Sequence, residues 1–343
     1  MAKLLFPLSQ IYGLMAKIDR KLTTAMKLPR PVISVGNITW GGTGKTPVVI
    51  KLARKLVKEG LRPVVLTRGY RRKNTSGKCL LASDGKGFRE IVEKTGDEPF
   101  LISESVPGAA VVVGSDRVSC GRFAMERLSP DVFILDDGFQ HWRLKRDLDI
   151  VCVSASNPFG NGCLIPAGIL REPVSALGRA GLVIITNPDM VSENELREIE
   201  KNIEKFRGDT PLRAVSKAAG MRQIVSGDLK QISEFQGGRV AAFSAIGDNS
   251  VFRKTLEANG LAVEDHFAFR DHHWFTPEQI NTIASRFRCP LVTTAKDAAR
   301  LGPLVRDMER TAAERFFALE IDIEFTKGES LWEEKIQSVL RPS

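Results

Sequence analysis

The sequence Val35-Gly36-Asn37-Ile38-Thr39-Trp40-Gly41-Gly42-Thr43-Gly44-Lys45-Thr46-Pro47 joins a short apolar run to a stretch with helical periodicity. A glycine-rich turn between a strand and a helix points backbone N–H groups and the positive helix end at one place, where they bind phosphate. There Lys45 can reach the β- and γ-phosphates of a nucleotide. Thr39 stands where the usual GxxxxGK[ST] pattern has its first glycine. The predicted nucleotide-binding residues are Gly41, Gly42, Thr43, Gly44, Lys45 and Thr46.

Short apolar, β-branched runs on either side of this loop predict strands that are covered on both faces of a mostly parallel sheet. They lie at positions 32–35, 64–66, 110–113, 132–135, 150–153 and 183–185. Right-handed crossovers then make a doubly wound α/β domain of the P-loop NTPase type. A charged amphipathic helix is expected at positions 192–206.

A second, smaller α/β domain is expected later in the chain. Its predicted strands lie at 240–243, 291–294 and 316–323, and its predicted helices at 251–259 and 277–287. The boundary is expected within residues 208–227. The predicted organisation is therefore an N-terminal helix at 1–29, a P-loop domain at 30–215, and a C-terminal domain at 216–343 that closes over the active site.

Two acids end the apolar run at positions 132–135, namely Asp136 and Asp137. A carboxylate at the carboxyl end of a strand beside a phosphate loop can bind Mg²⁺ directly or through water. Together with Thr46, whose hydroxyl suits Mg²⁺, the two acids predict a metal site for nucleotide hydrolysis or transfer. The spacing leaves open which of the two aspartates binds the ion.

The composition is that of a globular protein with a basic surface. Of 343 residues, 43% are hydrophobic and 27% charged, and the formal net charge of +9 favours anionic partners. The five cysteines are odd in number and widely spaced, without a CxxC pair, which argues against a disulfide framework or a zinc site and favours a reducing compartment.

The first thirty residues predict an amphipathic helix. Its apolar stripe consists of Leu4, Leu8, Ile11, Met15, Ile18 and Leu22. Lysines and arginines accompany the stripe, and Asp19 is the only acid, a pattern typical of a helix that lies in the interface of an anionic membrane. The alternative is an ordinary helix that packs its stripe on its own domain. The segment is too short and too polar to be a spanning helix.

The sequence DDGFQH at 136–141, together with the phosphate loop, resembles the tetraacyldisaccharide 4'-kinase family, the lipid A 4'-kinases. The resemblance covers about residues 31–300, and Arg71 replaces a glycine common in the family. Further motifs follow in the family's order: Thr67-Arg68-Gly69-Tyr70, Gly96-Asp97-Glu98-Pro99, Gly114-Ser115-Asp116-Arg117, Leu170-Arg171-Glu172-Pro173, Phe269-Arg270-Asp271-His272-His273 and TxKDxxR at 293–300.

This resemblance implies a peripheral enzyme at the cytoplasmic face of the bacterial inner membrane. It would use ATP and Mg²⁺ to phosphorylate the 4'-hydroxyl of a tetraacyl disaccharide 1-phosphate, a lipid A precursor. The expected partners are this lipid and the anionic membrane surface, with no nucleic acid and no obligate protein partner.

The resemblance also implies roles for individual residues. Asp97 would be the general base, and His272, which is favoured over His273, would orient it. Arg171 would neutralise charge on the transferred phosphoryl group or grip a substrate phosphate, and Glu172 would join the magnesium shell. The roles of Lys296 and Asp297 stay open. The candidates for holding the disaccharide are Arg68, Asp116 and Arg117.

Two other classes of protein share part of this pattern. A P-loop switch of the metallochaperone or insertase type usually has a lysine near the start of the loop, where this chain has Trp40. A nucleic-acid-binding ATPase would explain the basic charge, but no binding motif is recognisable and few aromatic residues interleave the basic runs. Stimulation by an acylated disaccharide would separate the three classes.

Overall fold

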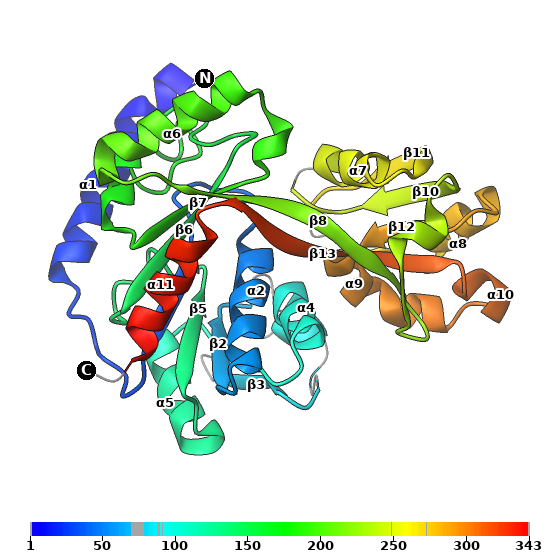
Figure 1. The fold of residues 1–343 in the computed structure, drawn as a ribbon, viewed down its shortest axis with the longest axis horizontal. Coiled ribbons are helices and arrows are strands. Elements are labelled where there is room, and N and C mark those ends of the chain that lie inside the picture. The colour runs from blue at the N-terminus through cyan, green and yellow to red at the C-terminus, as the bar shows by residue number, and fades with distance from the viewer. Residues whose placement is uncertain are drawn as a thin grey trace. The chain divides into compact units, whose positions relative to one another are not determined.

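The computed structural model describes residues 2–69, 79–87, 90, 92–247, 249–271 and 273–341, and for residues 2–4 and 93 the backbone alone. The chain forms two compact units (Figure 1). The first unit comprises Met1–Thr95, Ile102–Val215 and Ile323–Ser343, and the second comprises Gly96–Leu101 and Ser216–Asp322.

The first unit is built on a mostly parallel sheet, which confirms the predicted doubly wound α/β class. Its strand order is β7-β6-β1-β5-β2-β4-β3, and the start of β8 (Leu212–Gln223) pairs with β7. The strands are β1 (Val32–Gly36), β2 (Pro63–Thr67), β3 (Leu80–Asp84), β4 (Ala110–Val113), β5 (Val132–Asp136), β6 (Leu148–Ser154) and β7 (Leu182–Thr186). All six predicted strands are confirmed, and β3 runs antiparallel to β4.

Helices cover both faces of this sheet. Those that pack on it are α2 (Lys45–Lys58), α5 (Arg117–Leu128), α6 (Glu193–Arg207) and α11 (Glu329–Leu340). Helices α1 (Ala2–Leu22) and α3 (Val92–Thr95) also belong to this unit. Phe133 and Leu135 of β5 lie in the buried cluster that includes α5, and Val151 and Val153 of β6 lie in the cluster that includes α6. Because side chains alternate along a strand, the residues between them point to the other face, where α2 contacts β1, β2 and β5.

In the second unit, parallel strands follow one another in the order β11-β10-β12-β13. These strands are β10 (Arg239–Ser244), β11 (Ala262–Ala268), β12 (Leu291–Thr294) and β13 (Phe316–Lys327), and a short strand β9 (Leu229–Lys230) pairs with β8. The helices are α7 (Asn249–Ala258), α8 (Pro277–Arg286), α9 (Ala295–Arg306) and α10 (Arg310–Ala313). The predicted strands and helices of this region are confirmed. Helix α4 (Asp97–Ser105) begins in this unit and ends in the first.

The division between the units differs in detail from the organisation expected from the sequence. The region 208–227 contains the long strand β8, and the first unit ends at Val215 within it. Ile323–Ser343 group with the first unit, although the sequence placed them in the C-terminal domain. The reason is packing, since Trp332 and Ile336 of α11 are fully buried and Glu333 forms an ion pair with Lys55 of α2.

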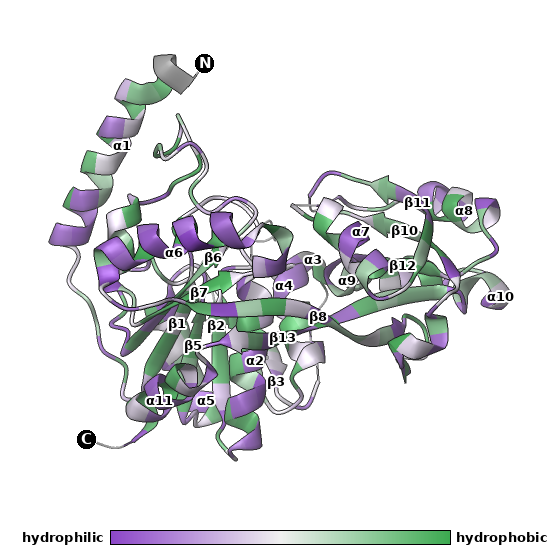
Figure 2. Ribbon diagram, turned by 45° about the horizontal axis from the view of Figure 1, so that its top comes forward, coloured by the Kyte–Doolittle hydropathy of each residue, from purple (hydrophilic) through white to green (hydrophobic). Residues whose placement is uncertain are grey.

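Helix α1 is amphipathic as predicted, and its apolar stripe faces away from the domain. Leu8, Ile11 and Met15 are 53%, 55% and 64% exposed, and Leu22 is 78% exposed. Figure 2 shows hydrophobic bands along α1 between hydrophilic ones. The alternative in which the stripe packs on its own domain is therefore wrong. No helix in the described ranges combines the length and apolar character needed to cross a bilayer.

Candidate active site

The phosphate loop leads from β1 to the first residue of α2. Gly44 precedes the helix with a φ of 71°, and Gly41 has a φ of 116°, both in the region that favours glycine. A Cβ atom on Gly44 would lie 3.2 Å from the Cγ2 atom of Thr186. Thr186 in turn donates a hydrogen bond from Oγ1 to the carbonyl oxygen of Thr43, at 3.1 Å. The end of β7 therefore fixes the curl of the loop.

The structure explains why Thr39 replaces a glycine. Thr39 is not among the residues with positive φ, and it forms an isolated antiparallel bridge with Leu170. Hydrogen bonds flank this bridge, from the Trp40 amide to Ile169 (2.6 Å) and from the Arg171 amide to Ile38 (2.7 Å). A β-branched residue suits such extended backbone. The loop thus begins as a strand paired with the Leu170-Arg171-Glu172-Pro173 segment.

Asp136 and Asp137 lie beside this loop but have different surroundings. Asp136 is paired in register with Val35 and accepts a hydrogen bond from Oγ1 of Thr67, at 2.9 Å. Burial raises the pKa of the Asp136 carboxyl, and the charge of Asp137 adds to this effect. Burial also acts to raise the pKa of Asp137, but the charges of Lys45 and Arg171 outweigh it and lower that pKa. Asp137 is therefore firmly ionised.

Lys45 and Arg171 converge on Asp137. The Nζ atom of Lys45 lies 3.5 Å from Oδ1 of Asp137, and Nη1 of Arg171 lies 2.9 and 3.1 Å from its two carboxylate oxygens. Two cations and two acids thus meet at the carboxyl ends of β1 and β5. This arrangement fits a nucleotide's phosphates together with a divalent cation, because both charge signs are available within one site.

Glu172 is held by partners that the sequence did not reveal. Its carboxylate accepts two hydrogen bonds from Arg179, at 2.9 and 3.2 Å, and one from Nε2 of Gln140, at 2.9 Å. The same Nε2 atom donates to the carbonyl oxygen of Asn37 in the phosphate loop. Gln140 therefore ties Glu172 to the loop.

No three His, Cys, Asp or Glu side chains within the described part of the chain are placed to hold one metal ion. Mg²⁺ in kinases commonly uses one or two carboxylates and completes its shell with phosphate oxygens and water. Asp136, Asp137 and the hydroxyl of Thr46 provide such a donor set. The residues present therefore fit Mg²⁺, whereas the carboxylate of Glu172, also predicted as a ligand, is occupied by Arg179 and Gln140.

The candidates for substrate binding have mixed surroundings. Asp116 caps α5 by accepting hydrogen bonds from the amides of Val118 and Ser119. Arg117 is 5% exposed and donates to the carbonyl oxygens of Gly114 and Ser115, while its buried Nε has no partner among the described residues. Arg68 follows β2 directly. Tyr70 and Arg71 lie outside the described residues.

In the second unit, Asp97 lies next to two cations of α9. Asp97 is 5% exposed at the first turn of α4. Its Oδ2 atom lies 3.7 Å from Nη1 of Arg300 and 3.9 Å from Nζ of Lys296, and Lys296 also contacts Oδ1 of Asp271 at 3.5 Å. The TxKDxxR motif therefore places both of its cations toward this carboxylate.

Asp297, whose role was open, lies within the interior of the second unit. It is fully buried, accepts hydrogen bonds from the amide of Ala245 (2.9 Å) and the hydroxyl of Thr294 (2.8 Å), and pairs with Arg300. The buried carboxylate thus orients the guanidinium that faces Asp97. Its contacts make it a support for Arg300.

Of the two adjacent histidines, the structure describes His273. His272 lies outside the described residues. His273 has its ring stacked on Phe269 at a centroid distance of 4.8 Å, and its Nε2 atom is 2.9 Å from Oε1 of Gln279. These contacts hold His273 within the second unit's aromatic cluster.

Comparisons with known proteins identify the family of this chain. The family model LpxK, tetraacyldisaccharide-1-P 4'-kinase, matches residues 1–341. Tetraacyldisaccharide 4'-kinase of Pelobacter propionicus is 39% identical over 93% of this chain and 88% of its own length. That of Geobacter metallireducens is 41% identical over 81% of both chains.

A solved structure is similar over nearly the whole length. The crystal structure of the "apo" form of LpxK from Aquifex aeolicus in complex with ATP has a TM-score of 0.79, with 32% sequence identity over 99% of both chains. The phosphate loop, the acidic strand end and the ordered motifs described above occur in a chain that matches the family from end to end. The chain therefore belongs to the tetraacyldisaccharide-1-phosphate 4'-kinase family.

Proposed function

We propose that this protein transfers the γ-phosphate of ATP to the 4'-hydroxyl of a tetraacyl disaccharide 1-phosphate, a step of lipid A biosynthesis. The observation that carries the proposal is the convergence of Lys45, Arg171 and the two acids beside a phosphate loop, in a member of this kinase family. Phosphoryl transfer needs mainly positioning and charge stabilisation, which these groups supply.

Each group of the first unit has a proposed task. The amides from Gly41 to Thr46 cradle the phosphates, Lys45 binds the β- and γ-phosphates, and Arg171 stabilises charge on the transferred group. Asp136, Asp137 and Thr46 hold Mg²⁺, which when bound neutralises phosphate charge. Burial and then the charge of Asp137 raise the pKa of Asp136, and a cation beside both acids would offset the second effect.

The acceptor hydroxyl needs a base, and we assign this role to Asp97. Its Oδ2 atom lies within 4 Å of Nζ of Lys296 and Nη1 of Arg300, and these contacts restrain the carboxylate. By family resemblance, His272 orients this carboxylate. Arg68 and Arg117 are proposed to serve the anionic disaccharide, with Asp116 fixing the start of the helix that carries Arg117.

The test is incubation of the protein with γ-labelled ATP, Mg²⁺ and a tetraacyl disaccharide 1-phosphate. Label is expected on the lipid, at the 4' position. ATP hydrolysis stimulated instead by nucleic acid or by a protein partner, with no labelled lipid, would overturn the proposal in favour of one of the two other classes.

We propose further that α1 binds the anionic cytoplasmic face of the inner membrane. The exposed stripe of Leu8, Ile11, Met15, Ile18 and Leu22 supplies apolar area for insertion at the interface. Lys17, Arg20 and Lys21 on the same helix supply charge for anionic head groups. A lipid substrate that stays in the bilayer requires an enzyme that works at its surface.

Replacement of Leu8, Ile11 and Met15 by serine should release the protein from anionic vesicles, because about 1.5–3 kcal/mol of transfer free energy is lost for each buried side chain. Co-sedimentation measures binding, and higher salt should weaken that of the parent protein. The matched control carries serine at Val225 and Leu229, which are also exposed, and should still bind. Equal sedimentation of both variants would contradict the proposal.

A further inference from the structure

Helix α1 has a second face, opposite in character to the exposed stripe. Among its described side chains, residues 5–22, Ser9 alone is buried, with 1% exposure. Its hydroxyl donates to the carbonyl oxygen of Leu164 at 2.8 Å and accepts from the amide of Ala167 at 3.0 Å. A single side chain thus satisfies two backbone groups of the loop that precedes Arg171.

Gly13 extends this face by one helical turn. A Cβ atom there would lie 2.6 Å from Cδ1 of Leu164, so the loop approaches the helix as closely as glycine allows. Ser9 and Gly13 are four residues apart and therefore lie on the same side of the helix. Gly13 costs the helix about 1 kcal/mol relative to alanine, and this close contact is the structural reason for its presence.

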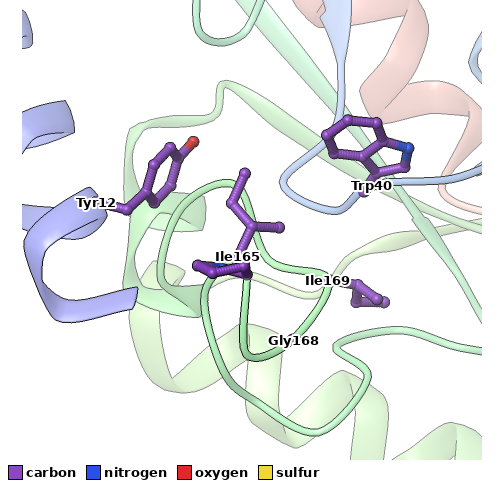
Figure 3. A pocket seen from close by; sticks show the side chains of 6 residues that line it. Tyr12, Trp40, Ile165, Gly168 and Ile169 are labelled. Carbon is purple, nitrogen blue, oxygen red and sulfur yellow. The ribbon is translucent and has the colours of Figure 1, made fainter. Parts of the chain in front are cut away.

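The same loop lies against the start of the phosphate loop on its other side. Leu170 bridges both Leu164 and Thr39, and Trp40 donates its amide to the carbonyl oxygen of Ile169. The junction contains a pocket of about 460 Å³. Figure 3 shows Tyr12 of α1 on one side of it and Trp40 on the other. Hydrogen bonds therefore join α1 to the loop, and the backbone of the loop continues directly into Arg171 and Glu172.

A second connection runs through aromatic rings. The guanidinium of Arg20, near the end of α1, lies 5.2 Å from the centre of the Trp142 ring, and that of Arg179 lies 4.8 Å from it. Arg179 is the residue that holds Glu172 by two hydrogen bonds. Helix α1 is thus connected to Glu172 in two ways, through the loop that precedes Arg171 and through Trp142 and Arg179.

We propose that the face of α1 formed by Ser9 and Gly13 is a positioning element of the active site, which fixes loop 163–171 and thereby Arg171 and Glu172. The apolar stripe of the helix binds the membrane, whereas this face acts on catalysis through the loop. The inference rests on the proposed catalytic role of Arg171.

Ser9→Ala removes the hydroxyl and leaves the Ala167 amide without its partner. We expect kcat to fall about three- to tenfold in detergent-dispersed substrate, since sub-ångström displacement of a charged group weakens transition-state contacts. The KM for ATP and vesicle binding should change little. Hydrogen exchange at the amides of Ala167 and Gly168 should become faster, a change that loss of membrane binding would not produce. The variant with serine at Leu8, Ile11 and Met15 should behave in the opposite way, with lost vesicle binding and unchanged exchange at the amides of Ala167 and Gly168.

A second variant keeps the test valid if Ser9→Ala is poorly folded. Gly13→Val should push Leu164 away and lower kcat, and adding Leu164→Ala should restore part of it. Unchanged kcat and unchanged amide exchange in both Ser9→Ala and Gly13→Val, with Arg171→Ala strongly impaired, would overturn this inference alone. If Arg171→Ala itself retains full activity, the proposed role of Arg171 fails, and the inference fails with it.

Discussion

The Lys45→Ala variant should lose at least ~2 kcal/mol of transition-state stabilisation, about 30-fold in kcat/KM, while its melting curve stays close to that of the parent. Lys45 begins α2 directly after Gly44, and its ammonium lies 3.5 Å from Asp137, in the middle of the charged site. A lysine at this position of a phosphate loop reaches the β- and γ-phosphates, where negative charge builds up.

The matched control for this variant is Lys51→Ala, on the same helix. Lys51 lies over the ring of Phe325 with its Nζ atom 5.5 Å from the ring centre, and it has no proposed role in the reaction. It should keep the parent rate. Wild-type turnover in Lys45→Ala, with the protein intact by thermal melting, would exclude Lys45 from nucleotide chemistry.

The sequence predicts the sheet well where strands are covered on both faces. Such strands are continuous apolar runs, as in β1 and β5, and their pattern needs no knowledge of neighbours. Strands β3, β8 and β11 were missed because each mixes polar with apolar residues, as suits the edge of a sheet or a strand partly exposed to solvent. These segments form strands because of the strands that they pair with, and the local sequence does not show this pairing.

The site shows the same limit. Motif and spacing predict the acids at 136–137 and the lysine of the loop, but the residues that hold the acidic side chains in place lie on other elements. Thr67 on β2 supports Asp136, and Arg179, at the end of a 3₁₀ helix, holds Glu172. A lone threonine or arginine carries no pattern, so only the fold reveals such contacts. The motif TxKDxxR is recognisable in the sequence. Only the burial of Asp297 shows that this residue supports Arg300 and is not itself available to contact a ligand.

The periodicity of helix α1 predicts its apolar stripe but not the contacts of its opposite face. The apolar stripe follows from steps of three and four residues. Ser9 and Gly13 lie outside this stripe and have no sequence signature, and glycine has a low helix propensity. Their value arises from what lies against them, Leu164 and Ala167, about 150 residues later.

The environment of Asp97 makes it a specific candidate for the base. Its carboxylate is nearly buried and has two cations within 4 Å, so its position is restrained. A carboxylate is a weak base, but a loose phosphoryl-transfer transition state mainly requires an acceptor in the right place when the proton leaves the sugar hydroxyl. Removing the acceptor while keeping the shape of the side chain is therefore the informative change.

Asp97→Asn should lower kcat by roughly 10²- to 10⁴-fold, the usual cost of a lost general base, with little change in the affinity for ATP. Single-turnover kinetics and a separate nucleotide-binding measurement distinguish the two quantities. Some loss of stability is expected as well, because Lys296 and Arg300 lose a neighbouring charge. Asp265→Asn is the matched control. Asp265 forms a more exposed ion pair with Arg286 in the same unit, and this variant should keep the parent activity.

If His272 orients Asp97, His272→Ala alone should have a smaller effect on kcat than Asp97→Asn. The double variant should be little slower than Asp97→Asn, because the effects of residues that act as a unit are not additive. Multiplicative losses would show that the two residues act independently, and a fully active Asp97→Asn would remove Asp97 from the chemistry.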